Sequence, residues 1–148
     1  MTTDAWLAIA HHLAVFGVLA VLATEWALVR PGIGAADVDR IARVDAAYGV
    51  LAAVVLVVGF TRVFAGDKPT DFYFENPVFW AKIAAFAVVG LVSIGPTLRY
   101  VRWRRAAAGG TGPAAEEVVA ARRAIAIELA VFALIPALAA VMARGIGL

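Results

Sequence analysis

Four long apolar runs occupy almost the whole chain, and they limit its fold more than any other feature. The run 5–24 contains no Asp, Glu, Lys or Arg, and its twenty residues as a helix match a hydrocarbon core of about 30 Å. The other uncharged runs, 46–61, 83–98 and 129–143, cover only about 23–24 Å as helices. The charged residues at their edges must therefore lie slightly inside the membrane, or the membrane must thin there.

The composition indicates the same class of protein. Of the 148 residues, 64% are hydrophobic and 16% are charged, whereas a soluble domain carries about 25% charge. Part of this apolar surface must face lipid, so the bilayer is the expected partner. The absence of cysteine excludes disulfides, thiolate metal sites and thiol catalysis. The arginines cluster at helix ends rather than along a groove with aromatic residues, so nucleic-acid binding is not expected.

Helix-breaking and capping residues divide the chain into four spans. The predicted spans, all in one domain, are about 5–29, 41–64, 77–104 and 117–143. Asn76 and Pro77 are typical of a helix cap followed by the first helical residue. Glu116 and Glu117 suit the start of the last helix, where the helix dipole favours acidic groups. The predicted fold is all-α, an up-down four-helix bundle integral to the membrane.

The basic residues predict how the bundle is oriented. Nine lie in or beside the first and third loops: Arg30, Arg40, Arg43, Arg99, Arg102, Arg104, Arg105, Arg122 and Arg123. The other four are Arg62, Lys68, Lys82 and Arg144. The positive-inside rule then places the nine on the cytoplasmic side of a bacterial inner membrane, with both termini periplasmic or extracellular. The first span has no preceding Lys or Arg, so we expect it to remain as an anchor rather than to be cleaved.

The unusual residues of each span fall on one helix face, because positions 11 or 14 apart align at about 100° per residue. The aligned pairs are His11 with Glu25, Tyr48 with Arg62, Lys82 with Ser93, and Glu128 with Met142. The first pair shares its stripe with Ala14, Val18 and Leu22. Since polar groups are costly in lipid, these stripes are predicted to face one another inside the bundle.

Three acidic residues, Glu25, Asp45 and Glu128, form a predicted layer towards the arginine-rich side. One interpretation is structural pairing with nearby arginines, which are Arg43, Arg99 and Arg123. The other is a proton-accepting site within the membrane.

Two adjacent histidines, His11 and His12, lie in the first span roughly 9 Å below its outer boundary. They point about 100° apart, so both cannot readily bind one metal from the same helix. The stripe selects His11 for the interior, either as a hydrogen-bonded core residue or as a metal or haem ligand. Arg62 and Lys82 suit haem propionates, or else extend to the interface. The second axial ligand is Met142, Lys82 or none.

Four segments, 59–64, 76–82, 93–99 and 128–136, resemble a family of bacterial four-span inner-membrane proteins that is known only as a domain of unknown function. The resemblance covers nearly the whole chain, and its most specific motif is Asn-Pro-x-Phe-Trp-x-Lys at 76–82. It implies a membrane bundle and no established activity.

The order of His11, Trp80 with Lys82, and Arg122-Arg123 before Glu128 is similar to the four-helix haem-binding protoporphyrinogen oxidase and to copper-resistance-type membrane proteins. In that comparison His11 falls at the histidine of the first span. Trp80 and Lys82 fall near a Trp-x-x-x-Lys motif, with two fewer residues between them. The third span here has no histidine.

The leading hypothesis is a haem b-binding protein for electron transfer or porphyrinogen-type oxidation, with His11 as the metal ligand and His12, Arg62 and Lys82 beside the cofactor. One alternative is a proton- or cation-coupled transporter or channel that uses the three acidic residues. Another is a non-catalytic accessory membrane subunit. Association into a homodimer is also expected.

Overall fold

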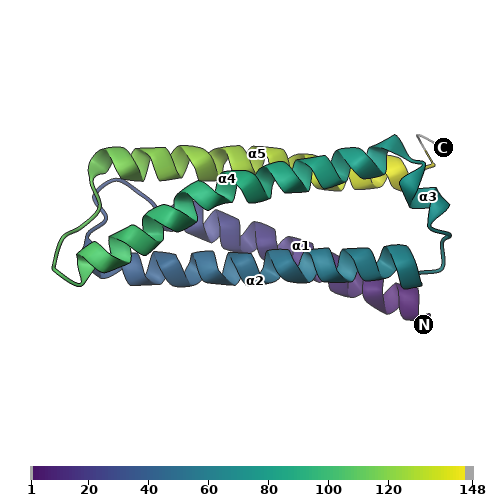
Figure 1. Cartoon of the computed structure of the whole chain (residues 1–148), viewed down its shortest axis with the longest axis horizontal. Helices are drawn as coiled ribbons and strands as arrows, with labels where there is room; N and C mark the ends of the chain where they lie inside the picture. Colours follow the sequence, from purple (N-terminus) through teal and green to yellow (C-terminus); the bar gives the residue numbers. More distant parts are fainter. Residues whose placement is uncertain (1, 146–148) are drawn as a thin grey trace.

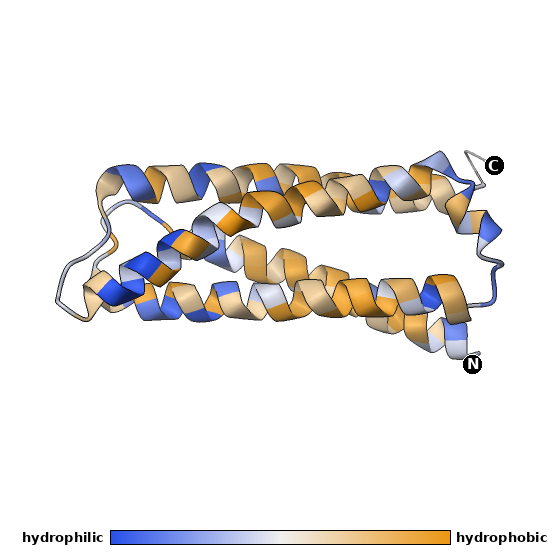
Figure 2. Cartoon of the chain, in the orientation of Figure 1, coloured by the Kyte–Doolittle hydropathy of each residue, from blue (hydrophilic) through white to orange (hydrophobic). Residues whose placement is uncertain are grey.

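The protein is described by a computed structural model that covers residues 2–145, and this part of the chain forms five helices. They are α1 (Thr3–Leu28), α2 (Ala35–Ala65), α3 (Asp71–Phe74), α4 (Pro77–Ala107) and α5 (Ala115–Ala143). The four long helices run up and down, and each is long and apolar enough to cross a membrane. Apolar residues fill their central turns and polar residues gather at their ends (Figure 2). The prediction of an all-α, up-down four-helix bundle is confirmed.

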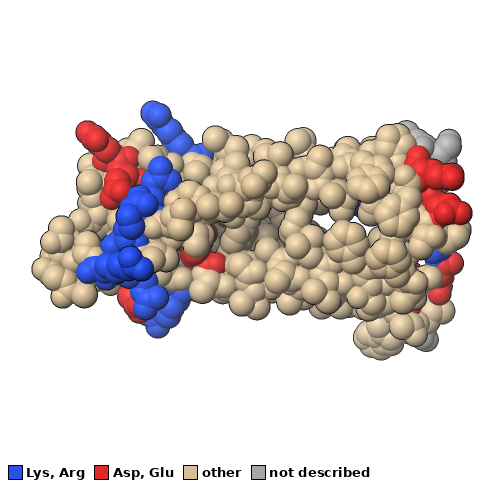
Figure 3. Space-filling model, viewed as in Figure 1, with Lys and Arg blue, Asp and Glu red and all other residues tan. Residues whose placement is uncertain are grey.

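The bundle consists of two helix pairs. The most extensive packing is within the pair α1 and α2 and within the pair α4 and α5. Between the pairs, α4 crosses towards α2 at the end of the bundle that holds the loops 29–34 and 108–114 (Figure 1). We call this the arginine-rich end, because most of the Lys and Arg side chains form a band there (Figure 3). The opposite end, with both termini and α3, is the terminal end.

One face of α1 forms much of the buried core. Ala14, Val18, Leu22 and Glu25 are all buried, with exposed fractions of 6% or less. They are the stripe that the spacing of 14 residues predicts, so this face of α1 does turn into the bundle. On other faces, large apolar side chains such as Leu13 are exposed, as lipid contact requires.

Local sequence explains where the helices begin. The Asn76 side chain accepts a hydrogen bond from the Val78 backbone N–H at 2.8 Å, and Pro77 is the first residue of α4. Both roles follow from the Asn-Pro signal. The break before α2 is shorter than expected. The turn at Gly32 (φ +85°) and a bond from the Gly34 N–H to the Asp37 carboxylate (2.9 Å) let α2 begin at Ala35.

Two hydrogen bonds join α5 to the C-terminal end of α1 at the arginine-rich end. The Arg122 guanidinium on α5 donates to the carbonyls of Trp26 (2.8 Å) and Val29 (2.7 Å), and it lies 3.7 Å from the centre of the Trp26 ring. The last carbonyls of a helix have no partner within the helix. Arg122 therefore satisfies the C-terminal end of α1 from a neighbouring helix.

Candidate functional site

A cavity of about 310 Å³ lies between the two helix pairs towards the terminal end. Its walls are mainly aliphatic and aromatic side chains from all four long helices and α3, among them Val55, Phe72, Phe86, Phe132 and Ile135. The space-filling view shows an opening between α2 and α4 in this half of the molecule (Figure 3). A largely apolar cavity with a few polar groups is the usual form of a small-molecule site.

His11 contributes to this cavity from α1. Its Nδ1 atom is buried and makes no hydrogen bond of good geometry to a described residue, although the ring also lies near the Val55 backbone of α2. The ring lies against α2, where a Cβ atom added to Gly59 would be 3.1 Å from the His11 Cε1. Buried polar atoms without a partner are rare in folded proteins, so this nitrogen is a candidate ligand atom beside the cavity.

His12 has a different environment from its neighbour. Its side chain is exposed, and its Nδ1 lies 2.6 Å from the Ala8 carbonyl one turn earlier in α1. The His12 ring meets the His11 ring edge to face, with 6.2 Å between centroids, so it borders the same cavity. Of the two histidines, His11 has the free and buried ring nitrogen.

Two cationic side chains of the predicted site also line the cavity, and each has a partner. Arg62 Nε donates to the Asp4 carboxylate at 3.3 Å. Lys82 Nζ lies 3.8 Å from Met142 Sδ, so the thioether is close to a cation. The structure therefore brings His11, Arg62, Lys82 and Met142 to one cavity. Sequence reasoning missed Asp4, although its position at the outer end of the first span, level with Arg62, was an available signal.

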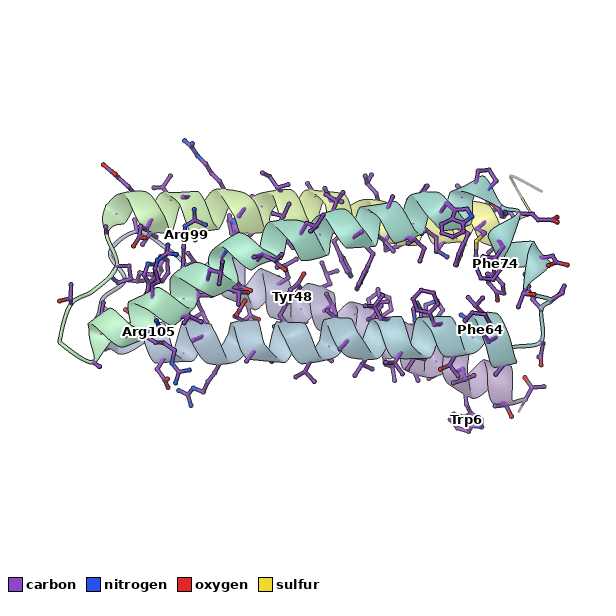
Figure 4. All side chains as sticks on the ribbon, viewed as in Figure 1. Trp6, Tyr48, Phe64, Phe74, Arg99 and Arg105 are labelled. Atoms are coloured by element: carbon purple, nitrogen blue, oxygen red, sulfur yellow. The ribbon has the colours of Figure 1, made fainter. Side chains whose placement is uncertain are left out.

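The short helix α3 closes the terminal end of the cavity with aromatic side chains. Tyr73 is buried and packs edge to face on Phe79, with 5.8 Å between ring centroids. Trp80 Nε1 donates to the Phe74 carbonyl at 2.9 Å, and Phe64 and Phe74 lie close together (Figure 4). Burial raises the pKa of the Tyr73 hydroxyl above its usual value, and the neighbouring Arg62 acts in the opposite direction. The sequence indicated only an interfacial aromatic belt here, not a helix that covers a cavity.

A second polar cluster lies deeper, towards the arginine-rich end. The Tyr100 hydroxyl donates to Glu25 Oε1 at 2.7 Å, and the Thr97 hydroxyl donates to Asp45 Oδ1 at 2.8 Å. Tyr48, which points between the helix pairs, has Glu128 as a polar neighbour. Glu25 and Glu128 are each only 2% exposed. Glu25 and Asp45 thus each have a hydroxyl partner on another helix, and Glu128 has the Tyr48 hydroxyl as a neighbour.

The expected pairing of these acids with arginines is wrong. Within residues 2–145, no ion pair joins Glu25, Asp45 or Glu128 to an arginine. Arg43 instead extends outwards, 74% exposed, and contacts Asp39 at 3.3 Å. A guanidinium at the end of a long stem remains hydrated there. A hydroxyl satisfies a buried carboxyl group without the cost of desolvating a second charge.

The chain offers few ligands for a metal held by protein alone. In the part that the structure describes, no group of three or more His, Asp or Glu side chains is placed to bind one ion. A haem iron needs only one or two protein ligands, because the porphyrin supplies the others. His11 alone meets that smaller requirement.

The fold and the charge distribution define a small multi-pass integral membrane protein with four spans. Residues 3–147 match the family described as "Predicted membrane protein (DUF2214)", and the chain belongs to this family. The expected membership of a four-span family of unknown function is thereby confirmed. No curated protein and no solved structure matches the chain, so the likeness to the haem-binding oxidase and to copper-resistance-type proteins gains no support.

Proposed function

We propose that this protein binds haem b in the cavity near the terminal end, for electron transfer or porphyrinogen-type oxidation. The observation that carries the proposal is the buried His11 Nδ1, which has no hydrogen-bond partner among the described residues. An imidazole nitrogen on a transmembrane helix is a common axial ligand of haem iron.

The other residues of the cavity fit the same group. Met142 offers a thioether as a second donor. Arg62 and Lys82 are cations that pair well with propionate carboxylates, and in this site a propionate would compete with Asp4 for Arg62. The aromatic walls suit a flat apolar ring, and the opening between α2 and α4 gives it room to extend. Bound haem supplies one-electron redox chemistry, while the chain binds it, orients it and excludes water.

The visible absorption spectrum of the detergent-purified protein tests this proposal directly. With haem available during expression, we expect a Soret band that remains with the protein during gel filtration. A colourless protein under these conditions would contradict haem binding. Proton or cation flux in liposomes that falls on Glu128→Gln would then favour the transporter alternative, and a co-purifying partner without pigment or flux would favour the accessory subunit.

Replacing Gly59 with alanine is expected to weaken haem binding about 10–100-fold, the range seen when support for a metal ligand is lost. The new Cβ would lie 3.1 Å from His11 Cε1 and 3.5 Å from Nδ1, so the ring must move. Gly49→Ala is the matched control on the same helix, because a Cβ there meets nothing within 4 Å. Haem titration followed by absorbance measures both variants, and equal affinities would contradict the assignment of His11.

Two expectations about the protein in its membrane also remain proposals: its orientation and its association into homodimers. We propose that the arginine-rich end faces the cytoplasm. The chain has no native cysteine, so single cysteines can report accessibility. A membrane-impermeant thiol reagent applied to intact bacterial cells permeable only at the outer membrane should label Asp67→Cys but label Thr111→Cys only after lysis. The reverse pattern would invert the orientation, and the mass of the solubilised protein tests the dimer.

A further inference from the structure

A second concave site lies on the outer side of α1 and α2, at the arginine-rich end. It is a groove of about 430 Å³ whose lining is Val21 and Thr24 from α1 with Arg40, Arg43, Val44 and Ala47 from α2. None of these residues lines the cavity of the haem proposal. The groove is therefore independent of that proposal.

The part of the groove nearest the arginine-rich end carries more positive than negative charge. Arg40 is exposed and, among the residues that the structure describes, forms no ion pair. Arg43 shares the Asp39 carboxylate with Arg104, at distances of 3.3 Å and 3.1 Å. One carboxylate thus serves two guanidinium groups, and Arg40 adds a third positive charge to the groove. This surface suits an anion.

The deeper part of the groove is apolar. Val21, Val44 and Ala47 lie further from the helix ends than the guanidinium groups, towards the middle of the spans. The Thr24 hydroxyl donates to the Ala20 carbonyl at 2.8 Å, so it presents no unsatisfied donor to an apolar ligand. The groove is therefore complementary to a phospholipid. Its cationic part matches an anionic headgroup, and its apolar part matches an acyl chain.

We propose that this groove binds an anionic phospholipid of the surrounding bilayer. Arg40 and Arg43 would contact the headgroup phosphate, which a planar guanidinium can bind with two parallel hydrogen bonds. An acyl chain would lie on Val21, Val44 and Ala47. Basic pockets between transmembrane helices are known to bind anionic lipid headgroups in this way.

The test is lipid binding to the full chain in a neutral detergent, measured by thermal stability at increasing concentrations of phosphatidylglycerol, phosphatidylcholine or inorganic phosphate. Phosphatidylglycerol should stabilise the wild type well beyond phosphatidylcholine. Its apparent dissociation constant should rise about 30-fold in the double variant Arg40→Gln/Arg43→Gln, if each arginine contributes as a basic residue does near an anionic membrane. The matched control is Arg105→Gln/Arg123→Gln, which removes the same charge from the same end but outside the groove.

Three results would overturn the proposal. The first is an equal loss of affinity in the control variant, which would mean a diffuse charge effect. The second is equal stabilisation by phosphatidylcholine, which would mean that the arginines do not select the headgroup. The third is full stabilisation by inorganic phosphate alone, which would mean an anion site without an acyl chain. Loss of haem binding in other variants leaves each of these readouts unchanged.

Discussion

His11→Ala is expected to abolish the Soret band of the purified protein. The substitution removes the one buried imidazole nitrogen that is free of a hydrogen-bond partner in the described part of the chain. Losing the ligand itself should cost more than the roughly 10–100-fold that is lost with a supporting group. Absorbance after haem titration, normalised to protein concentration, measures the effect.

Two comparison variants separate ligation from folding. His12→Ala should keep most of the pigment, because the His12 ring is exposed and engaged with the Ala8 carbonyl. In His11→Gly, added imidazole should restore the band by occupying the vacated space. A fully pigmented His11→Ala protein would show that the cofactor is held elsewhere or not by this chain's histidine.

Tyr100→Phe is expected to destabilise the bundle by roughly 1–3 kcal/mol, the cost of leaving a buried polar group without its hydrogen bond. The Tyr100 hydroxyl donates to Glu25 at 2.7 Å, and both side chains are almost fully buried. The bond joins the two helix pairs, from α4 to α1, so its loss weakens their association. Thermal unfolding of the protein in detergent measures the change.

The matched control for this variant is Tyr73→Phe, because no hydrogen bond of the Tyr73 hydroxyl is seen among the described residues and the change should therefore be much smaller. Adding Glu25→Leu to Tyr100→Phe should recover part of the lost stability, since it removes the unpaired partner as well. If Tyr100→Phe and Tyr73→Phe unfold at the same temperature, the Tyr100–Glu25 bond does not stabilise the bundle.

The sequence predicts the long helices and the buried face of α1 well, for a physical reason. A helix in lipid must satisfy its own backbone, so length and apolarity alone define it. Helical periodicity then identifies which residues share a face, and Ala14, Val18 and Glu25 illustrate this. The start of α4 was equally predictable, because Asn76 and Pro77 act through local geometry.

The partners across the bundle were not predictable in the same way. Periodicity places Glu25 on an inward face but does not determine what lies opposite, and its partner Tyr100 is 75 residues away. The pairing of Arg62 with Asp4, 58 residues apart, depends equally on how the helices pack. Charge matching alone suggested arginines for the buried acids. It did not account for the ability of long arginine side chains to reach water, which left the hydroxyl groups as the interior partners.

The contact that Arg122 makes with α1 also bears on how the protein is made. The carbonyls of Trp26 in α1 and of Val29, its C-cap, are synthesised well before the α5 guanidinium that binds them. Until α5 has been made, those carbonyls therefore lack this partner. Insertion of α5 supplies this partner, so the contact between α1 and α5 forms only after the intervening helices have been made.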